Sequence, residues 1–241
     1  MGSSPYLTFT VNGTDEDLIN MSYSLWSVNA YANTIRERLM SAEVSEQTKN
    51  TCMGECLVWK AMAYFYLVRT FGAVPIVHSN SEDIAAGNYN EKYKVQIPDV
   101  YEYIVMTLEK AIELLPASNS KGRIDQYTAK GLLAKVYLTK SGYGMNGSRN
   151  EEDLRKAAVY AKDVIDNSGR HLLENYSDVF RLANNFNEEC LLSWHWSASS
   201  DMWTCQNALQ SDLAIVGFDE FGDCWGGYNG PSVDLQDAFG E

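Results

Sequence analysis

The sequence predicts a mainly α-helical protein, built from hairpins like those of tetratricopeptide repeats, with long loops and little β structure. Three observations predict this class. Apolar residues recur at helical spacing through most of the first 170 positions, glycine and proline stand where the helices should end, and two helices carry the same small-x-x-Tyr element. A generic helical bundle would produce the same apolar spacing.

Five helices are expected in chain order, separated by polar or glycine-containing segments. Between the second and third helices, the residues Asn80–Gln96 are polar and include Gly87, so this stretch is expected to be a loop. The helices should run from about Trp26 to Ser41, Gln47 to Thr70, Asp99 to Leu115, Asp125 to Ser141 and Leu154 to Ser168. Pro116 should stop the third, and Asp99 and Asp125 can cap or open their helices.

The second of these helices constrains the protein most. Val58, Met62 and Phe65 fall on one stripe at helical spacing, so several neighbours must pack around it. Gly72 tolerates the left-handed conformation that often ends a helix, and Pro75 cannot continue one.

The repeated element is Ala61-x-x-Tyr64 in the second helix and Ala134-x-x-Tyr137 in the fourth. Each is followed by a glycine and then by another amphipathic helix. In a tetratricopeptide hairpin the small residue lets paired helices approach, and the tyrosine fills the groove beside it.

The character of the chain changes at Cys190. Leu191–Trp196 is an apolar and aromatic run of strand length, and Ser197–Gly230 is rich in Gly, Asp, Ser, Trp and Tyr without helical periodicity. A strand there would place one face of the run in the core. Long loops on a rigid scaffold commonly carry binding sites, so this segment is the expected functional region.

The aromatic residues of these loops, together with short amides and carboxylates, favour a carbohydrate ligand. Sugar rings stack their C–H faces on indole and phenol rings, while their hydroxyls need polar partners. The candidate ligand-binding residues are Trp203, Trp225, Tyr228, Asn229, Trp194, Trp196, Tyr89 and Tyr93.

The second helix and its stop carry a characteristic order of residues: Glu55, Tyr64, Phe65, Leu67, Val68, Phe71, Gly72, Pro75, Ile76 and Val77. With Tyr127–Leu138, Ala157–Ile165, Asn187–Trp194 and Pro231–Phe239, this order resembles the SusD/RagB family of nutrient-binding outer-membrane lipoproteins. The resemblance covers most residues from about Trp26 onward, although Lys60 and Ala73 stand where that family usually has Arg and Asp.

The resemblance implies a cell-surface protein of a Gram-negative bacterium that captures glycans and delivers them to a SusC-like TonB-dependent transporter. It also implies a signal peptide and a lipid-modified cysteine in the natural protein, and tetratricopeptide-like units in the fold. Residues 1–241 would then be a single SusD-like domain truncated at both ends, with 190–230 as its aromatic loop segment.

Composition excludes several other classes. The net charge of −13 opposes nucleic-acid binding and docking onto anionic lipid, and no apolar run is long enough to span a bilayer. Five cysteines without a C-x-x-C pair, and three scattered histidines, predict free thiols and no metal site. No cofactor-binding or catalytic motif occurs, so neither a cofactor nor a catalytic residue is expected.

Three alternatives stay open at this point. Some members of the family are thought to capture peptides, and an acidic peptide binder would have the same helices. A helical-repeat adaptor would use its concave face to bind a protein. A glycosidase would need two acids across the scissile bond, and Asp219, Glu220 and Asp223 are candidates, although a solvated acidic loop explains them more simply.

Overall fold

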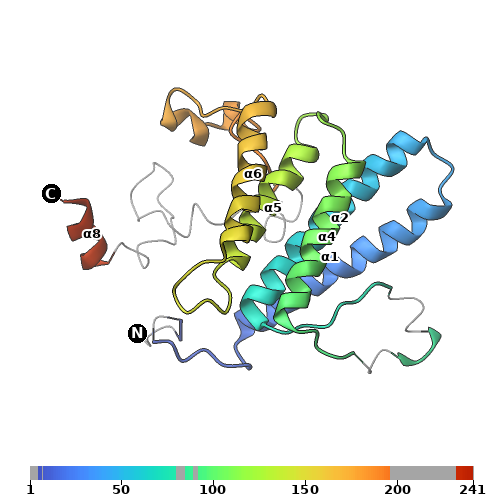
Figure 1. Ribbon diagram of the computed structural model, residues 1–241, viewed down its shortest axis with the longest axis horizontal. Coiled ribbons are helices and arrows are strands. Elements are labelled where there is room, and N and C mark those ends of the chain that lie inside the picture. The colour runs from blue at the N-terminus through green and yellow to red at the C-terminus, as the bar shows by residue number, and fades with distance from the viewer. Residues whose placement is uncertain (1–4, 7, 80–84, 89–91, 196–231, 241) are drawn as a thin grey trace, which may run out of the picture. The chain divides into compact units, whose positions relative to one another are not determined.

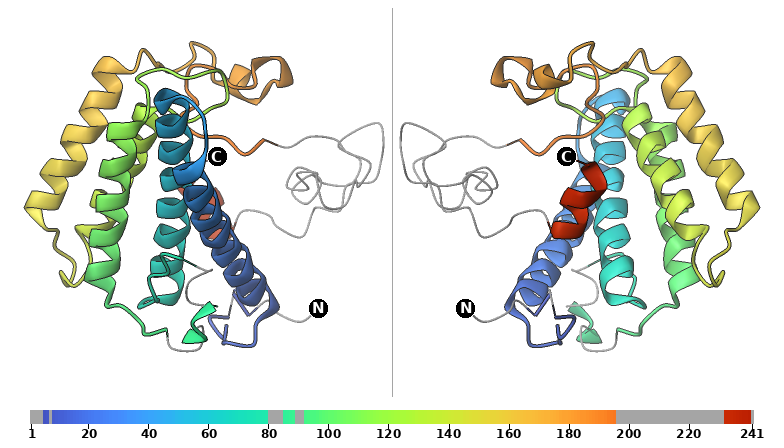
Figure 2. Two further views of the ribbon diagram at one scale, coloured as in Figure 1. Left: turned by 90° about the vertical axis from the view of Figure 1, so that its right-hand side faces the viewer. Right: turned by 90° about the vertical axis from the view of Figure 1, so that its left-hand side faces the viewer.

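Five long helices follow one another along the chain and pack in that order. The structure is a computed structural model and describes residues 5–6, 8–79, 85–88, 92–195 and 232–240. The long helices are α1 (Glu16–Ser41), α2 (Glu46–Phe71), α4 (Ile97–Leu114), α5 (Gln126–Lys140) and α6 (Glu151–Asn167). Each packs against the one before it, which Figure 2 shows as a row of helices (Figures 1 and 2).

The described residues fall into two compact units, Met1–Ser193 and Trp194–Glu241. The first contains the five long helices and two short 3-10 helices, η2 (Tyr176–Phe180) and η3 (Leu182–Asn184). In the second, the described residues include helix α8 (Val233–Phe239), whose first turn is capped by the Ser232 hydroxyl.

The five predicted helices are confirmed, but α1 begins at Glu16, ten residues before the expected start at Trp26, and the other ends shift by a few residues. Side chains of Asp15, Ser45, Asp125 and Asn150 accept a backbone N–H of the first turn of α1, α2, α5 and α6. Helix α4 begins at Ile97, two residues earlier than Asp99, because Pro98 suits the first turn, where its missing N–H has no partner to lose.

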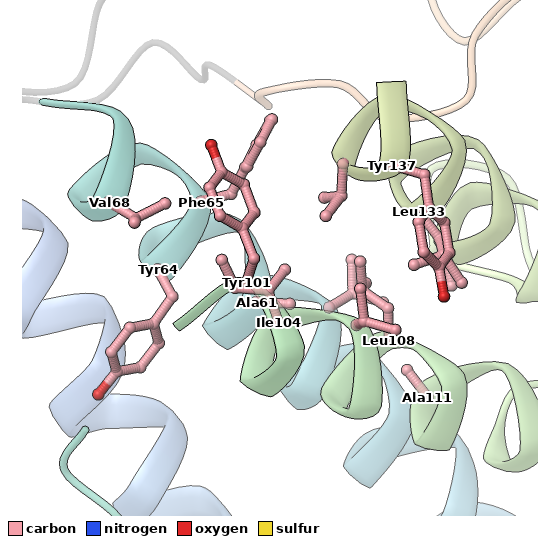
Figure 3. Packing of buried hydrophobic residues seen from close by; sticks show 14 of the residues in the cluster. Ala61, Tyr64, Phe65, Val68, Tyr101, Ile104, Leu108, Ala111, Leu133 and Tyr137 are labelled. Atoms are coloured by element: carbon pink, nitrogen blue, oxygen red, sulfur yellow. The ribbon is translucent and has the colours of Figure 1, made fainter. Parts of the chain in front are cut away.

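The two small-x-x-Tyr elements lie at helix pairs, as a tetratricopeptide-like hairpin requires. Helix α2 with Ala61 and Tyr64 packs on α4, and α5 with Ala134 and Tyr137 packs on α6. Ala61 and Tyr64 are fully buried. In Figure 3 Ala61 lies beside Ile104 of α4, whereas the Tyr64 ring points toward α1, where it meets the edge of the Trp26 ring. The ring of Tyr137 stacks on that of Tyr160 from α6, with 6.0 Å between their centroids.

The strand expected at Leu191–Trp196 is wrong for the part that the structure describes, 191–195, which is irregular. A strand needs a neighbouring ladder, and here the Leu191 carbonyl instead accepts the Thr128 hydroxyl of α5 at 2.7 Å. Across the described ranges the β pairing amounts to an isolated antiparallel bridge between Val74 and Val95. No helix among the described residues is long and apolar enough to cross a bilayer.

The backbone of Val77 connects the segment after α2 to α1 and α2 by hydrogen bonds. Gly72 ends α2 at φ 73°, and beyond Pro75 the Val77 N–H donates to the buried Tyr64 hydroxyl at 2.8 Å. The Val77 carbonyl accepts from Asn33 at 3.1 Å and from Lys60 at 3.3 Å. The chain that leads on toward Tyr93 therefore leaves the helices from a fixed point.

Lys60 is an ionisable group of this core, with 4% of its surface exposed. Its ammonium donates to Asn33 Oδ1 and lies near the Arg36 charge. Burial, with the Arg36 charge adding to it, lowers the pKa of Lys60 from 10.5 to about 8. Burial therefore makes Lys60 easier to deprotonate than a lysine in water, although a pKa of about 8 still leaves it charged at neutral pH, with Asn33 and Val77 as its acceptors.

This depressed pKa predicts a stability that rises with pH. Between pH 8 and 10.5 the unfolded chain binds the Lys60 proton more tightly than the folded chain, so raising the pH should favour folding. The contribution should grow by about 2 kcal/mol from pH 8 to pH 10. Burial also raises the pKa of Tyr103 to about 12, which opposes folding above pH 10. Urea unfolding of the parent and Lys60→Met proteins across pH 7.5–10 isolates the lysine, and equal slopes in the two would contradict the prediction.

Candidate functional site

An exposed aromatic loop precedes α1, and it is the strongest candidate site among the described residues of the helical unit. We call residues 5–6 and 8–15 the aromatic loop. Phe9 lies in it with 94% of its surface exposed and with φ at 55°, a left-handed conformation that bulky residues seldom adopt. Because the Phe9 ring is exposed to solvent, packing does not explain its strained backbone, and a role in binding is the better explanation.

The aromatic loop is held by its own hydrogen bonds. The Thr10 N–H donates to the Pro5 carbonyl at 2.9 Å, which closes the turn around Phe9. The hydroxyls of Thr8 and Thr10 are 2.9 Å apart, so one donates to the other. Asn12 Oδ1 accepts both the N–H and the hydroxyl of Thr14, at 2.9 and 2.6 Å. These bonds fix the backbone that presents the Phe9 ring.

Tyr6 joins the aromatic loop to the first turn of α1. Its hydroxyl donates to Asp15 Oδ1 at 2.6 Å, and the same oxygen accepts the Leu18 N–H at 3.1 Å. The hydrogen bond to the carboxylate raises the pKa of Tyr6 to about 12, and the bond from Tyr6 lowers the pKa of Asp15. Tyr6 therefore keeps its proton, and its ring keeps its place, at physiological pH.

The loop before α4 leaves the same end of the helices. Because α1, α2 and α4 alternate in direction, the start of α1, the end of α2 and the start of α4 meet at one end (Figures 1 and 2). Tyr93 lies in this second loop with 83% of its surface exposed. One end of the helical unit thus presents exposed rings from two loops, beside hydroxyl and amide groups.

The structure describes few of the other candidates from the sequence. Trp194 is 63% exposed and belongs to the second unit. Trp196, Trp203, Trp225, Tyr228, Asn229 and Tyr89 lie outside the described residues, as do the acidic positions 219, 220 and 223. Within the described ranges, no group of three His, Cys, Asp or Glu side chains is arranged to hold a metal, and Cys52, Cys56 and Cys190 are free thiols.

Tyr6 and Phe9 were not among the residues predicted from the sequence, whose aromatic candidates lie mainly in the long segment after Cys190. The available signal was the alternation of rings and threonines in YLTFT, shortly before a helix cap at Asp15.

Residues 8–138 match a protein family described as "Starch-binding associating with outer membrane". A SusD-like protein of Bacteroides ovatus is 37% identical over 236 residues, which are 95% of this chain and 42% of that protein. The chain belongs to the SusD-like family.

Solved structures agree with this membership. One, whose name includes xylogluco-oligosaccharide, has a TM-score of 0.85 and 34% identity, covering 98% of this chain and 47% of its own. Another, named a laminarin-binding SusD-like protein, has a TM-score of 0.70 and 25% identity, covering 82% of this chain and 43% of its own. The chain thus spans less than half the length of these SusD-like relatives.

Proposed function

We propose that this SusD-like chain is part of a non-catalytic protein that captures glycans at the outer surface of a bacterium. Its fold likeness over 98% of the chain to a structure named with xylogluco-oligosaccharide is the observation that carries the proposal. The exposed aromatic loop adds a chemical reason, because a ring flanked by hydroxyls and an amide suits a sugar.

Some of the proposed glycan contacts come from described residues of the helical unit, and the others are proposed from the sequence. In the helical unit, Phe9 stacks on a sugar ring, Tyr6 supports it, and Tyr93 gives a second exposed ring. From the sequence, Trp203, Trp225, Tyr228 and Asn229 are proposed to contribute further contacts, with Trp194, Trp196 and Tyr89. The captured glycan then passes to a SusC-like TonB-dependent transporter, and a lipid anchor in the full-length protein holds the assembly at the membrane.

Titration calorimetry with xylogluco-oligosaccharide, laminarin and a malto-oligosaccharide tests the proposal. Phe9→Ala should weaken binding by about fivefold or more, because a stacked ring contributes roughly 1 kcal/mol beyond the area it buries. Trp225→Ala should weaken it by a similar factor. Tyr23→Ala is the matched control, since Tyr23 is an exposed ring on the surface of α1 and should not affect binding.

The binding experiment tests glycan capture and the assigned residues separately. A parent protein that binds none of these glycans, nor any in a wider polysaccharide panel, would overturn glycan capture. A parent that binds, with both Phe9→Ala and Trp225→Ala binding as tightly, would overturn the assigned residues.

A further inference from the structure

Two hollows share residues of the segment that follows α6. One lies between helix α5 and this segment, and the other is formed by the segment itself together with Lys121. The larger has a volume of about 550 Å³ and the smaller about 410 Å³, and the side chains of Asn184 and Asn187 line both. We call the pair the asparagine groove. Each volume lies in the range of small-ligand sites, and neither hollow includes a residue of the aromatic loop.

An ion pair and a hydrogen bond hold the segment that forms the asparagine groove against helix α5. Asp125 at the start of α5 pairs with Arg170 at 2.8 Å, and the Thr128 hydroxyl donates to the Leu191 carbonyl at 2.7 Å. Within the segment, the Leu173 N–H donates to Glu189 Oε1 at 2.7 Å. The groove therefore exists before any ligand arrives, which lowers the entropic cost of binding.

Gly131 lets the segment lie close to α5. A Cβ at this position would be 2.9 Å from Leu191 Cδ1, so even a methyl group would require the Leu191 side chain to move. With glycine there, Leu132, Leu191 and Leu192 line the larger hollow with apolar surface.

Phe186 adds a ring to this apolar lining. It is partly exposed, and its φ of 60° makes it another non-glycine residue of the described chain with a left-handed backbone. Its neighbours Asn185 and Asn187 also line the larger hollow, which places amides beside a ring and an aliphatic floor. Amides both donate and accept hydrogen bonds, as sugar hydroxyls do.

The charged residues of the smaller hollow favour a neutral ligand over an anionic one. The smaller hollow is lined by the carboxylates of Glu174, Asp178 and Glu188, with Lys121 as its basic residue. An anionic ligand would be repelled there, whereas a neutral glycan would gain acceptors for its hydroxyls.

We propose that the asparagine groove is a second glycan-binding site for a neutral oligosaccharide, with Phe186 against a sugar ring and Asn185 and Asn187 bound to its hydroxyls. This inference rests on the glycan binding proposed above. The groove lies toward the start of α5 and the end of α6, the opposite end of the helical unit from the aromatic loop (Figure 2). The two sites are therefore separable by mutation.

Hydrogen–deuterium exchange of the whole 241-residue chain, with saturating xylogluco-oligosaccharide or laminarin, tests the second site. Peptides covering 184–193 should exchange more slowly with one of the two probes. Phe186→Ala and Asn185→Ala should abolish this protection and weaken retention on the matching polysaccharide by about fivefold. Phe180→Ala is the matched control, because Phe180 is an exposed ring of the same segment that lines neither hollow.

The result distinguishes this inference from the proposed function. If the glycan binds and protects other parts of the chain while 184–193 exchanges unchanged, the second site is wrong and glycan capture stands. Protection of 184–193 by a mixture of neutral peptides, and by neither glycan, would make the groove a peptide site and also overturn the inference. If neither probe nor the wider panel binds anywhere, the proposed function itself fails. Unchanged melting temperatures of the variants confirm that they fold.

Discussion

Replacing Gly54 with valine is expected to lower the free energy of unfolding by about 3 kcal/mol. Gly54 is buried in α2 where the helix meets the end of α4, and a Cβ there would be 2.6 Å from Leu115 Cγ and 3.3 Å from the Ala111 carbonyl oxygen. Glycine inside a helix costs about 1 kcal/mol relative to alanine, so the close approach of the two helices outweighs that cost. Urea unfolding followed by circular dichroism measures the loss.

Gly13 provides the control for this prediction. It lies in the aromatic loop with no atom within 4 Å of where a Cβ would be, so Gly13→Ala should change stability by less than about 0.5 kcal/mol. A Gly54→Val protein as stable as the parent would show that α2 and α4 do not approach as closely as described.

Asp125→Ala is expected to cost about 3 kcal/mol, and to loosen the segment after α6. The Asp125 carboxylate has two roles, since it caps α5 by accepting the Thr128 N–H at 3.0 Å and it pairs with Arg170 at 2.8 Å. Because Asp125 is buried, its removal leaves Arg170 without its ionic partner in a poorly solvated place. Hydrogen exchange in 168–193 should become faster along with the loss of stability.

Ser45→Ala separates the two roles of Asp125. Ser45 caps α2 by accepting the Thr48 N–H at 3.1 Å, its side chain is exposed, and it has no ionic partner, so its loss should cost about 1 kcal/mol. An Asp125→Ala protein that loses no more than Ser45→Ala, with exchange in 168–193 unchanged, would contradict a fastening role for Asp125.

Helix positions could be predicted closely because the signals are local. Asp125 opens α5 through a bond to a backbone three residues away, and Gly72 ends α2 by adopting a left-handed conformation. The prediction failed at Leu191–Trp196, where a strand was expected. An apolar run becomes a strand only if another strand lies beside it to form backbone hydrogen bonds. Here the Leu191 carbonyl instead accepts a hydrogen bond from the hydroxyl of Thr128, 63 residues away in the sequence.

The candidate site was less predictable. Trp203, Trp225 and Tyr228 remain proposals that rest on composition and on the family, while Tyr93 proved to be an exposed ring in a loop. Phe9 was missed because an aromatic residue near the start of a chain carries no periodic signal. Its exposure and its strained backbone arise from a turn that residues 5–10 close among themselves.

Most of the helices, the cap of α5 at Asp125, the stop of α2 at Gly72 and the family followed from the sequence by itself, because these depend on residues close along the chain and on a recognisable order of them. The start of α1 at Glu16 did not. The tertiary structure alone decided which rings face solvent and where the hollows lie. Exposure and cavity shape are set by side chains brought together from distant positions, as Gly131 and Leu191 are at the asparagine groove.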